Sequence, residues 1–350
     1  MGLDLWTAGG HLGAMNPSPP FAVAPMMDRT DRHCRFFHRQ LSRKTLLFTE
    51  MVAADAVIHG DRRALLAFDQ AEHPIALQLG GSDPFRLAEA ARIGATWGYD
   101  EINLNVGCPS DRVQSGKFGA CLMLDLDLVA RCVEAIRQAV GIRVTVKCRL
   151  GVDDQDVETA LDQFVDGLIS AGADGVWVHA RKAWLQGLSP KQNRTVPPLD
   201  YDRVYRLKRR LPGFFVGING GVQSVAETQK HLADVDGVMV GRSAYDRPAI
   251  LAGADRALFG SSSGPTADTV IDAMVSYANR QISDGVSVGR VTRPMLGLFH
   301  GLPGARAWRR ALTEGAAGRS NNANVIREAY AIVSDDRLLL EAAGRAPLAA

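Results

Sequence analysis

Eight short apolar or β-branched runs recur along the 350-residue chain, roughly one every 25 to 40 residues. The runs occupy residues 21–24, 46–51, 75–79, 101–106, 143–150, 175–179, 214–219 and 237–241. Most are separated by segments with helical spacing of apolar residues, such as Val129, Cys132, Val133 and Ile136. Strand and helix alternating eight times predict an α/β fold of the (β/α)8 TIM barrel type. An open doubly wound sheet is the alternative, but it usually has fewer strands.

Within several of these runs, apolar and polar residues alternate. In the fourth run Ile102 and Leu104 share one face, while Asn103 and Asn105 share the other. A barrel strand points one set of side chains at the surrounding helices and the other set inward. The inward polar residues near the strand ends are Gln78, Asn105, Lys147, His179 and Asn219. Because a barrel interior is a packed core, we expect them at the open mouth, where barrel active sites are built.

The pattern changes after about residue 250. The segment GSSSGPTADTV, residues 260–270, has the composition of a linker that ends at a helix start, with Thr266 or Asp268 as the cap. Three later segments show helical periodicity and no strand runs: residues 270–283, 293–312 and 321–342. The predicted organisation is a disordered leader at 1–20, a barrel at 21–255, a linker at 256–265 and a helical domain at 266–345.

The composition indicates the cellular compartment but says little about the function. The 40 basic and 38 acidic residues leave a net charge of +2, which neither favours nor excludes a polyanionic partner. None of the five cysteines has CxxC spacing, so we expect no metal site and a reducing cytoplasm. The first 20 residues lack the basic region of a signal peptide, and no apolar run approaches the roughly 18 to 20 residues of a membrane span. The sequence implies no stable protein partner.

Glycines follow the last two predicted strands. One strand ends in Asn219-Gly220-Gly221 and the other in Gly241-Arg242. A glycine pair after a strand is often only a turn, but phosphate sites in barrels commonly form on these two loops. Lys147 could be a structural ion-pair partner or extend to solvent. Beside Gln78, His179 and a phosphate site, it favours contact with an electron-rich ring such as a flavin, and FMN fits a single phosphate site.

Several segments together resemble the tRNA-dihydrouridine synthases, most closely the A-type subfamily, over about residues 21–312. They are APMMDRTDRHCRFF (24–37), LQLGGSDP (77–84), NLNVGCPSDRVQSGKFGACLM (103–123), VTVKCRLGVDD (144–154), VHARKAWLQGLSPKQNR (178–194), INGGV (218–222), VMVGRSAY (238–245) and RPMLGLFHGLPGARAWRRAL (293–312). The resemblance implies an FMN enzyme that takes electrons from NADPH and reduces a uridine of the tRNA D-loop. The subfamily suggests positions 20 and 20a.

The resemblance also implies roles for particular residues. Its flavin positions fall on Pro25, Met26, Met27, Gln78, Lys147, His179, Asn219, Gly220, Gly221, Gly241 and Arg242. Its catalytic acid falls on Cys108. Its tRNA contacts fall on Asn105, Lys191, Arg194, Arg306 and Arg309. The last two can shift in register, because Arg310 follows directly.

Reduction of the C5–C6 bond of uracil requires a hydride at C6 and a proton at C5. A thiol with a reference pKa of about 8.5 is mostly protonated at neutral pH, so Cys108 can act as the acid. Cys132 and Cys148 lie on apolar faces, and we expect them and Cys34 to be packing residues, whereas Cys121 could be either.

A tRNA partner requires basic surface, and residues 181–194 carry four basic residues and no acid. Residues 203–210 and the arginines at 306–310 add further charge, although most charge runs are only solvated faces. Two other functions remain open. One is an FMN barrel dehydrogenase acting on a free pyrimidine, similar to dihydroorotate dehydrogenases, and the other is a tRNA-binding scaffold without chemistry.

Overall fold

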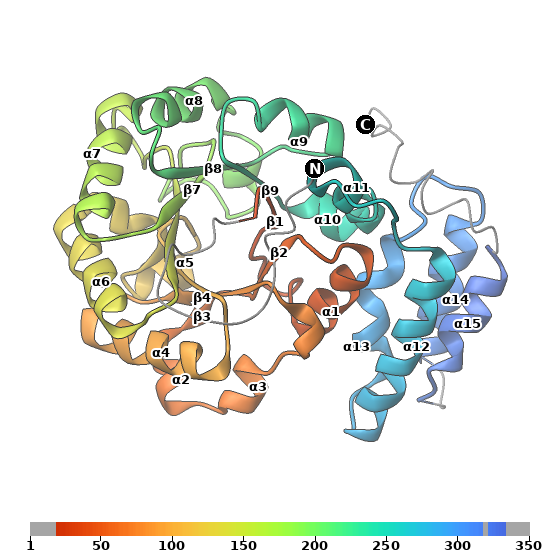
Figure 1. Cartoon of the computed structure of the whole chain (residues 1–350). Helices are drawn as coiled ribbons and strands as arrows, with labels where there is room; N and C mark the ends of the chain where they lie inside the picture. Colours follow the sequence, from red (N-terminus) through yellow and green to blue (C-terminus); the bar gives the residue numbers. More distant parts are fainter. Residues whose placement is uncertain (1–18, 318–320, 334–350) are drawn as a thin grey trace.

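The computed structural model describes residues 19–317 and 321–333, and its centre is a closed barrel of parallel strands (Figure 1). The strands around the ring are β1 (Phe21–Val23), β2 (Leu46–Phe48), β4 (Ile75–Gly80), β5 (Glu101–Asn105), β6 (Arg143–Arg149), β7 (Gly175–His179), β8 (Phe215–Asn219) and β9 (Gly237–Val240). The ring closes because β1 pairs with both β2 and β9, and β2 pairs with β4. The predicted (β/α)8 barrel is confirmed.

The predicted strand at 46–51 is shorter in the structure, because β2 ends at Phe48. A ninth short strand, β3 (Val52–Ala53), pairs with the end of β4 beyond the last residue of β2. Between them, the Thr49 hydroxyl accepts a hydrogen bond from the backbone N–H of Gln78 at 3.0 Å. A side-chain oxygen thus takes the place of a backbone acceptor, and the regular ladder is interrupted at this residue.

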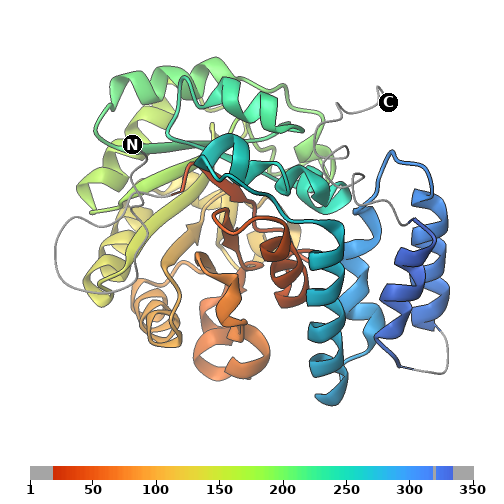
Figure 2. The same ribbon diagram turned by 45° about the vertical axis from the view of Figure 1, so that its right-hand side comes forward.

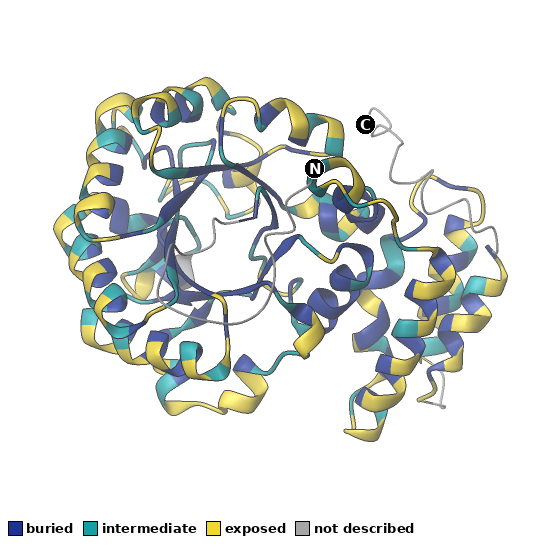
Figure 3. Cartoon of the chain, viewed as in Figure 1, coloured by how far each residue is buried: buried dark blue, intermediate teal, exposed yellow. Residues whose placement is uncertain are grey.

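Helices surround the barrel and bury their inner faces against it (Figure 3). They are α1 (Arg32–Leu41), α2 (Ala54–His59), α3 (Arg62–Leu66), α4 (Pro84–Trp97), α5 (Asp111–Ser115), α6 (Leu126–Ala139), α7 (Val157–Ser170), α8 (Tyr201–Arg210), α9 (Val225–His231), α10 (Arg242–Asp246) and α11 (Ala254–Phe259). Short 3-10 helices cover Gln70–Glu72, Gly119–Leu124, Gln192–Arg194, Pro248–Leu251 and Arg293–Gly297. The predicted apolar face of α6, with Val129, Cys132, Val133 and Ile136, is buried.

Trp177 fills the interior of the barrel below the mouth. It is fully buried and packs with Phe48 and Met239. Glycines on the two following strands make room for the indole: a Cβ on Gly217 would lie 2.2 Å from Trp177 Cε3, and one on Gly237 would lie 2.8 Å from its Cη2. Because real Cβ atoms essentially never come so close, these two positions require glycine, and the closed interior leaves only the mouth for a ligand.

In the described part of the chain after residue 260, four further helices form a bundle beside α1 and α10 (Figures 1 and 2). They are α12 (Ala267–Ser283), α13 (Val288–Thr292), α14 (Ala305–Ala317) and α15 (Asn324–Ala331). Thr266 caps α12 by accepting a hydrogen bond from Thr269 N. The bundle meets the barrel where Tyr277 stacks on Phe36, with ring centroids 3.9 Å apart, and its hydroxyl lies 2.9 Å from His33 Nδ1.

The helix predicted at 293–312 is interrupted. A 3-10 turn ends at Gly297, and α14 begins only at Ala305, after Gly301 and Gly304 have adopted positive φ angles of 82° and 81°. The helix predicted at 321–342 is observed as α15, and residues 334–342 lie outside the described part. Within residues 19–317 and 321–333, no helix is both long and apolar enough to cross a membrane.

Candidate active site

Polar side chains of three neighbouring strands form a hydrogen-bonded ladder inside the barrel mouth. Gln78 Nε2 donates to Asn103 Oδ1, and Asn105 Nδ2 donates to Gln78 Oε1, both at 2.8 Å. Asn103 Nδ2 in turn donates to Thr145 Oγ1 at 2.8 Å. All four residues are buried, and each amide is held in one orientation by its neighbours. The ladder therefore presents Gln78 and Asn105 to the mouth in fixed geometry.

A cavity of about 600 Å³ opens above this ladder, within the size range of ligand sites. All of the predicted flavin residues line it: Pro25, Met26, Met27, Gln78, Lys147, His179, Asn219, Gly220, Gly221, Gly241 and Arg242. Cys108, Asn105 and Arg194 line it as well. Lys191 does not; it is exposed at the start of the 3-10 helix Gln192–Arg194.

Cys108 is held at the cavity edge by the residues around it. The Asn105 side-chain oxygen accepts hydrogen bonds from the backbone N–H groups of Gly107 at 3.2 Å and Cys108 at 3.0 Å. The Cys108 carbonyl accepts from Ala120 N at 2.9 Å. Gly119 passes so close that a Cβ there would lie 2.5 Å from this carbonyl, and its φ of 77° also favours glycine. The thiol is half-buried, with Sγ 3.5 Å from Ser110 Oγ.

The other four cysteines lie outside the cavity. Cys34, Cys132 and Cys148 are fully buried, which confirms their prediction as packing residues. Burial raises the pKa of the Cys132 and Cys148 thiols to about 12 and raises the pKa of Cys34 well above its usual value. Cys121 is half-buried and donates to the Phe118 carbonyl at 3.1 Å.

Lys147 points into the cavity and donates a hydrogen bond from Nζ to Asn219 Oδ1 at 3.0 Å. Asn219 is fixed in turn by donating to the Met239 carbonyl at 2.7 Å. Burial, followed by repulsion from the nearby Arg149, lowers the pKa of Lys147 to about 8. At neutral pH the ammonium is still mostly protonated, so it can meet a negatively charged ligand.

His179 is the last residue of β7, the strand between those that carry Lys147 and Asn219, and it is in register with Asn219 across the β7–β8 pair. Burial, followed by repulsion from Arg149 and Lys147, lowers its pKa well below the usual value, so the imidazole is neutral. Its Nδ1 is buried and has no hydrogen-bond partner within the described ranges. Because His179 lines the cavity, this nitrogen is an atom that a bound ligand could satisfy.

The cavity lining is strongly basic. Its cationic residues are Arg29, Lys147, Arg149, Arg194, Arg242 and Arg247. Among the described residues, the one carboxylate that lines it, Asp246, is paired with Arg29 at 2.9 Å. An anionic group such as a phosphate is therefore favoured, and the positive φ angles of Gly220 and Gly221 shape the loop beside it. The residues present thus fit a flavin phosphate and an electron-rich ring.

Sequence reasoning missed Arg29, Arg149 and Arg247. Arg149 could have been found, because it follows Lys147 by two residues on the same inward face of β6. Arg29 lies on the connection after β1, and Arg247 lies between α10 and the 3-10 helix Pro248–Leu251; in neither place does a strand alternation mark the direction of a side chain.

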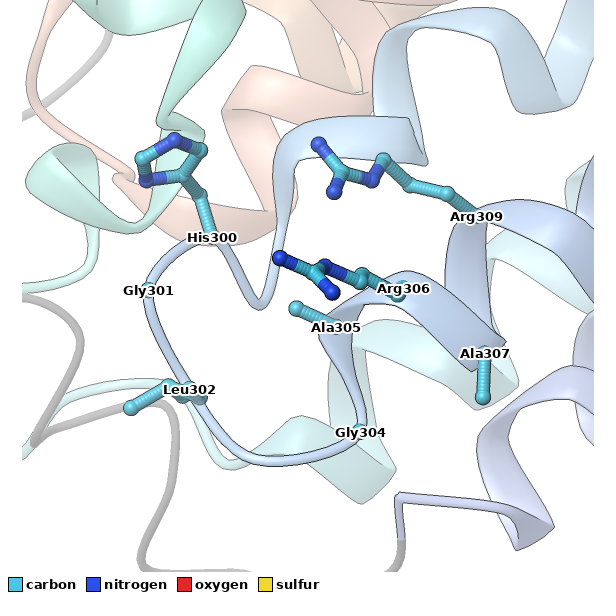
Figure 4. Close-up of a pocket in the computed structure, with 8 residues that line it drawn as sticks. All are labelled: His300, Gly301, Leu302, Gly304, Ala305, Arg306, Ala307 and Arg309. Atoms are coloured by element: carbon cyan, nitrogen blue, oxygen red, sulfur yellow. The ribbon is translucent and has the colours of Figure 1, made fainter.

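A second cavity of about 440 Å³ lies in the helical bundle (Figure 4). Arg306 and Arg309, at the start of α14, extend toward the same space as His300. His300 lines both cavities, so the two are neighbours. The structure thus brings the predicted tRNA contacts on α14 next to the mouth of the barrel.

The basic run at 203–210, which the sequence suggested as tRNA surface, serves another purpose. Arg203 pairs with Asp162 at 2.5 Å and Arg206 with Glu158 at 2.5 Å, and both carboxylates belong to α7. Arg210 pairs with Asp166 of the same helix at 2.8 Å. These arginines join α8 to α7, and their charge is neutralised there. The prediction that they contribute to a tRNA-binding surface was therefore wrong.

Comparison with known proteins gives a consistent result. Residues 22–332 match the family described as "Dihydrouridine synthase (Dus)". A protein of Escherichia coli (strain K12) named tRNA-dihydrouridine(20/20a) synthase is 56% identical over 321 residues, which cover 91% of this chain and 92% of the relative. A protein of the same name from Shewanella oneidensis is 53% identical over 317 residues, covering 90% and 94%.

The barrel is also similar to a solved structure, the old yellow enzyme homologue from Zymomonas mobilis, with a TM-score of 0.50 and 14% identity. The match covers 72% of this chain and 92% of that one. At this identity the likeness supports the fold alone.

Proposed function

The chain is an oxidoreductase of the dihydrouridine synthase family, and from this membership we propose that it reduces the C5–C6 double bond of uridines in the D-loop of tRNA. We assign the reaction to positions 20 and 20a, because relatives more than 50% identical over nine-tenths of the chain carry these positions in their names. The observation that carries the proposal is the shared cavity: Cys108 and every residue of the predicted flavin set line the same space.

The proposed cofactor is FMN. Gly220, Gly221, Gly241 and Arg242 would hold its phosphate, and Lys147 would meet the electron-rich part of the ring. Pro25, Met26, Met27, Gln78, His179 and Asn219 complete the proposed binding set. When bound, the flavin supplies a hydride to one carbon of the uracil ring. We propose NADPH as the source of the electrons.

Cys108 is the proposed acid. Its Sγ would release a proton to the second carbon of the double bond, which leaves a thiolate behind. The cationic side chain of Arg194 lines the same cavity and would stabilise that negative charge. The S–H bond breaks and a C–H bond forms, while the hydride completes the two-electron reduction. Solvent then reprotonates the thiolate.

The proposed partner is tRNA, bound across both cavities. A uracil stacked inside a folded loop must leave the stack to reach a cavity at the barrel mouth, so the protein needs contacts that hold the distorted loop. Asn105, Lys191, Arg194, Arg306 and Arg309 are the proposed contacts. We propose that residues 266–345 form the tRNA-binding domain beside a catalytic barrel at 21–255, and that the protein acts in the cytoplasm.

The family match favours this function over the two others considered. A dehydrogenase for a free pyrimidine would not need the arginine cluster on α14, and a scaffold would not need an acid and a flavin site in one cavity. NADPH oxidation measured with free uracil, with dihydroorotate and with unmodified tRNA separates them. Acceleration by tRNA alone supports the proposal, whereas acceleration by a free pyrimidine supports the first rival.

The proposal is tested by mapping dihydrouridine in tRNA from cells that lack the gene. Loss of the modification at positions 20 and 20a, restored by the wild-type gene, is the expected result. Retention at both positions in the deletion strain, with no other enzyme able to supply them, would overturn it.

A further inference from the structure

Arg149 joins two separate segments of chain at one side of the cavity. It is the last residue of β6, and its side chain is 4% exposed. Its Nε donates to the carbonyl of Gly107 at 3.0 Å, and its Nη1 donates to the carbonyls of Lys182 at 3.1 Å and Asn193 at 2.8 Å. One guanidinium thus holds backbone from the loop after β5 and backbone from the loop after β7.

Two of these carbonyls belong to peptide groups next to the proposed functional residues Cys108 and Arg194. The Gly107 carbonyl belongs to the peptide group that leads into Cys108, and the Asn193 carbonyl belongs to the peptide group that leads into Arg194. The planar fork of an arginine has fixed spacing between its N–H groups. Movement of either peptide group is therefore transmitted to the other through Arg149.

Further hydrogen bonds fix the loop after β5 and the loop after β7, which Arg149 joins. The buried Asn193 side chain accepts from Trp184 N and donates to the Trp184 carbonyl, both at 2.8 Å, which closes the loop on itself. Gln114 forms a second bridge, because its Nε2 donates to the carbonyls of Pro109 and Leu185, each at 2.9 Å. Two side chains thus tie the segment at 106–119 to the segment at 180–196.

We propose that Arg149 is a positioning residue that couples tRNA engagement to the proton donor. It keeps Cys108 and Arg194 in one arrangement, so that a tRNA contact at Arg194 and proton transfer from Cys108 depend on each other. The coupling rests on the proposed function. Burial lowers the pKa of Arg149 to about 10, which leaves the guanidinium charged at neutral pH.

Arg149→Lys tests the coupling, because an ammonium keeps the charge but cannot span carbonyls of both segments. Arg39 provides the matched control. It is equally buried and donates to the carbonyls of Ser42, Thr45, Glu72 and Pro74 near the starts of β2 and β4, at the opposite end of the barrel. Arg39→Lys therefore removes a similar carbonyl fork far from Cys108.

The first readout is hydrogen exchange and does not depend on activity. In Arg149→Lys, amide exchange is expected to rise together in peptides covering 106–119 and 180–196, whereas in Arg39→Lys it rises near residues 42–45 and 72–75 only. A rise in just one of the two segments, or equal changes in both variants, would contradict the link.

The second readout is the reaction of pre-reduced enzyme with tRNA in a single turnover. We expect Arg149→Lys to slow it by roughly 10²-fold. In a double-mutant cycle on tRNA affinity, Arg149→Lys is expected to add little to the loss of affinity caused by Arg194→Ala. In a second cycle on the single-turnover rate, it is expected to add little to the loss of rate caused by Cys108→Ala. Full additivity in both cycles, or a normal rate in Arg149→Lys, would overturn the coupling. A wild-type enzyme that does not react with tRNA would instead refute the proposed function.

Discussion

The side-chain oxygen of Asn105 lies 3.0 Å from the backbone nitrogen of Cys108 and accepts its hydrogen bond. The Asn105 amide nitrogen donates to Gln78 Oε1 at the same time. A residue predicted as a tRNA contact therefore also orients the proposed acid, and both ends of its side chain are engaged by the protein itself.

This double engagement predicts how Asn105 variants differ. Asn105→Ala leaves the Cys108 backbone without its acceptor, so we expect the single-turnover rate with tRNA to fall by about tenfold or more, with a smaller change in tRNA affinity. Asn105→Asp keeps the acceptor and loses only the donor to Gln78, so it should retain more of the rate. An equal loss of affinity and rate in both variants would make Asn105 a tRNA contact only.

The lowered pKa of Lys147 predicts an alkaline limit. Because burial lowers this pKa to about 8, the ammonium charge is present below pH 8 and is lost above it. We expect FMN affinity of the flavin-free protein to decline between about pH 7.5 and 9. Lys147→Met should bind FMN more weakly at neutral pH and show no such decline. Affinity of the wild type that is constant over this range would contradict the assignment.

Buried histidines predict sensitivity to acid. Burial lowers the pKa of His33 to about 4 and that of His38 to about 3. Both pKa values are depressed in the folded state, so their contribution is present above the unfolded value of about 6.5 and is lost as the pH falls toward 4. We expect about 1 to 2 kcal/mol of stability to be lost per histidine between about pH 7.5 and 5.

The check is the free energy of unfolding measured at both pH values. His38→Gln should reduce its difference between the two, whereas His59→Gln, at an exposed position, should leave that difference unchanged. A difference unaffected by His38→Gln would show that this histidine does not cause the acid sensitivity.

The arginines of the second cavity predict salt-dependent tRNA binding. Replacing Arg306 and Arg309 by alanine should weaken tRNA binding and reduce the slope of log affinity against log salt by about 1 for each phosphate that these side chains neutralise. Arg206→Ala is the matched control, because Arg206 is paired with Glu158 on the outer surface of the barrel. Similar effects of both changes would mean that the contribution of charge is not localised at α14.

The barrel and the inward-facing residues could be predicted from the sequence, because the alternation of apolar and polar residues can be recognised within each strand by itself. Gln78, Asn105, Lys147, His179 and Asn219 reach one cavity because strands of a parallel barrel end at the same mouth. The resemblance, in contrast, was needed to place Cys108, since a cysteine after a strand has no periodicity of its own.

Long-range pairing could not be predicted in this way. The arginines of α8 resemble an RNA-binding run in sequence, but their partners lie 41 to 48 residues earlier on α7. The break at Thr49 depends on a hydroxyl that meets the backbone of Gln78 on the next strand of the ring. The link through Arg149 joins three loops or strand ends that are distant in sequence, and only the fold brings them together.

The most direct test of the central claim is the single-turnover reaction of pre-reduced Cys108→Ala enzyme with unmodified tRNA in the absence of oxygen. The variant should bind FMN and be reduced by NADPH like the wild type, while its oxidation by tRNA slows by about 10²-fold or more. Cys121→Ala, which changes a thiol outside the cavity, should react normally. Oxidation of Cys108→Ala by tRNA at the wild-type rate, with dihydrouridine formed, would contradict the account.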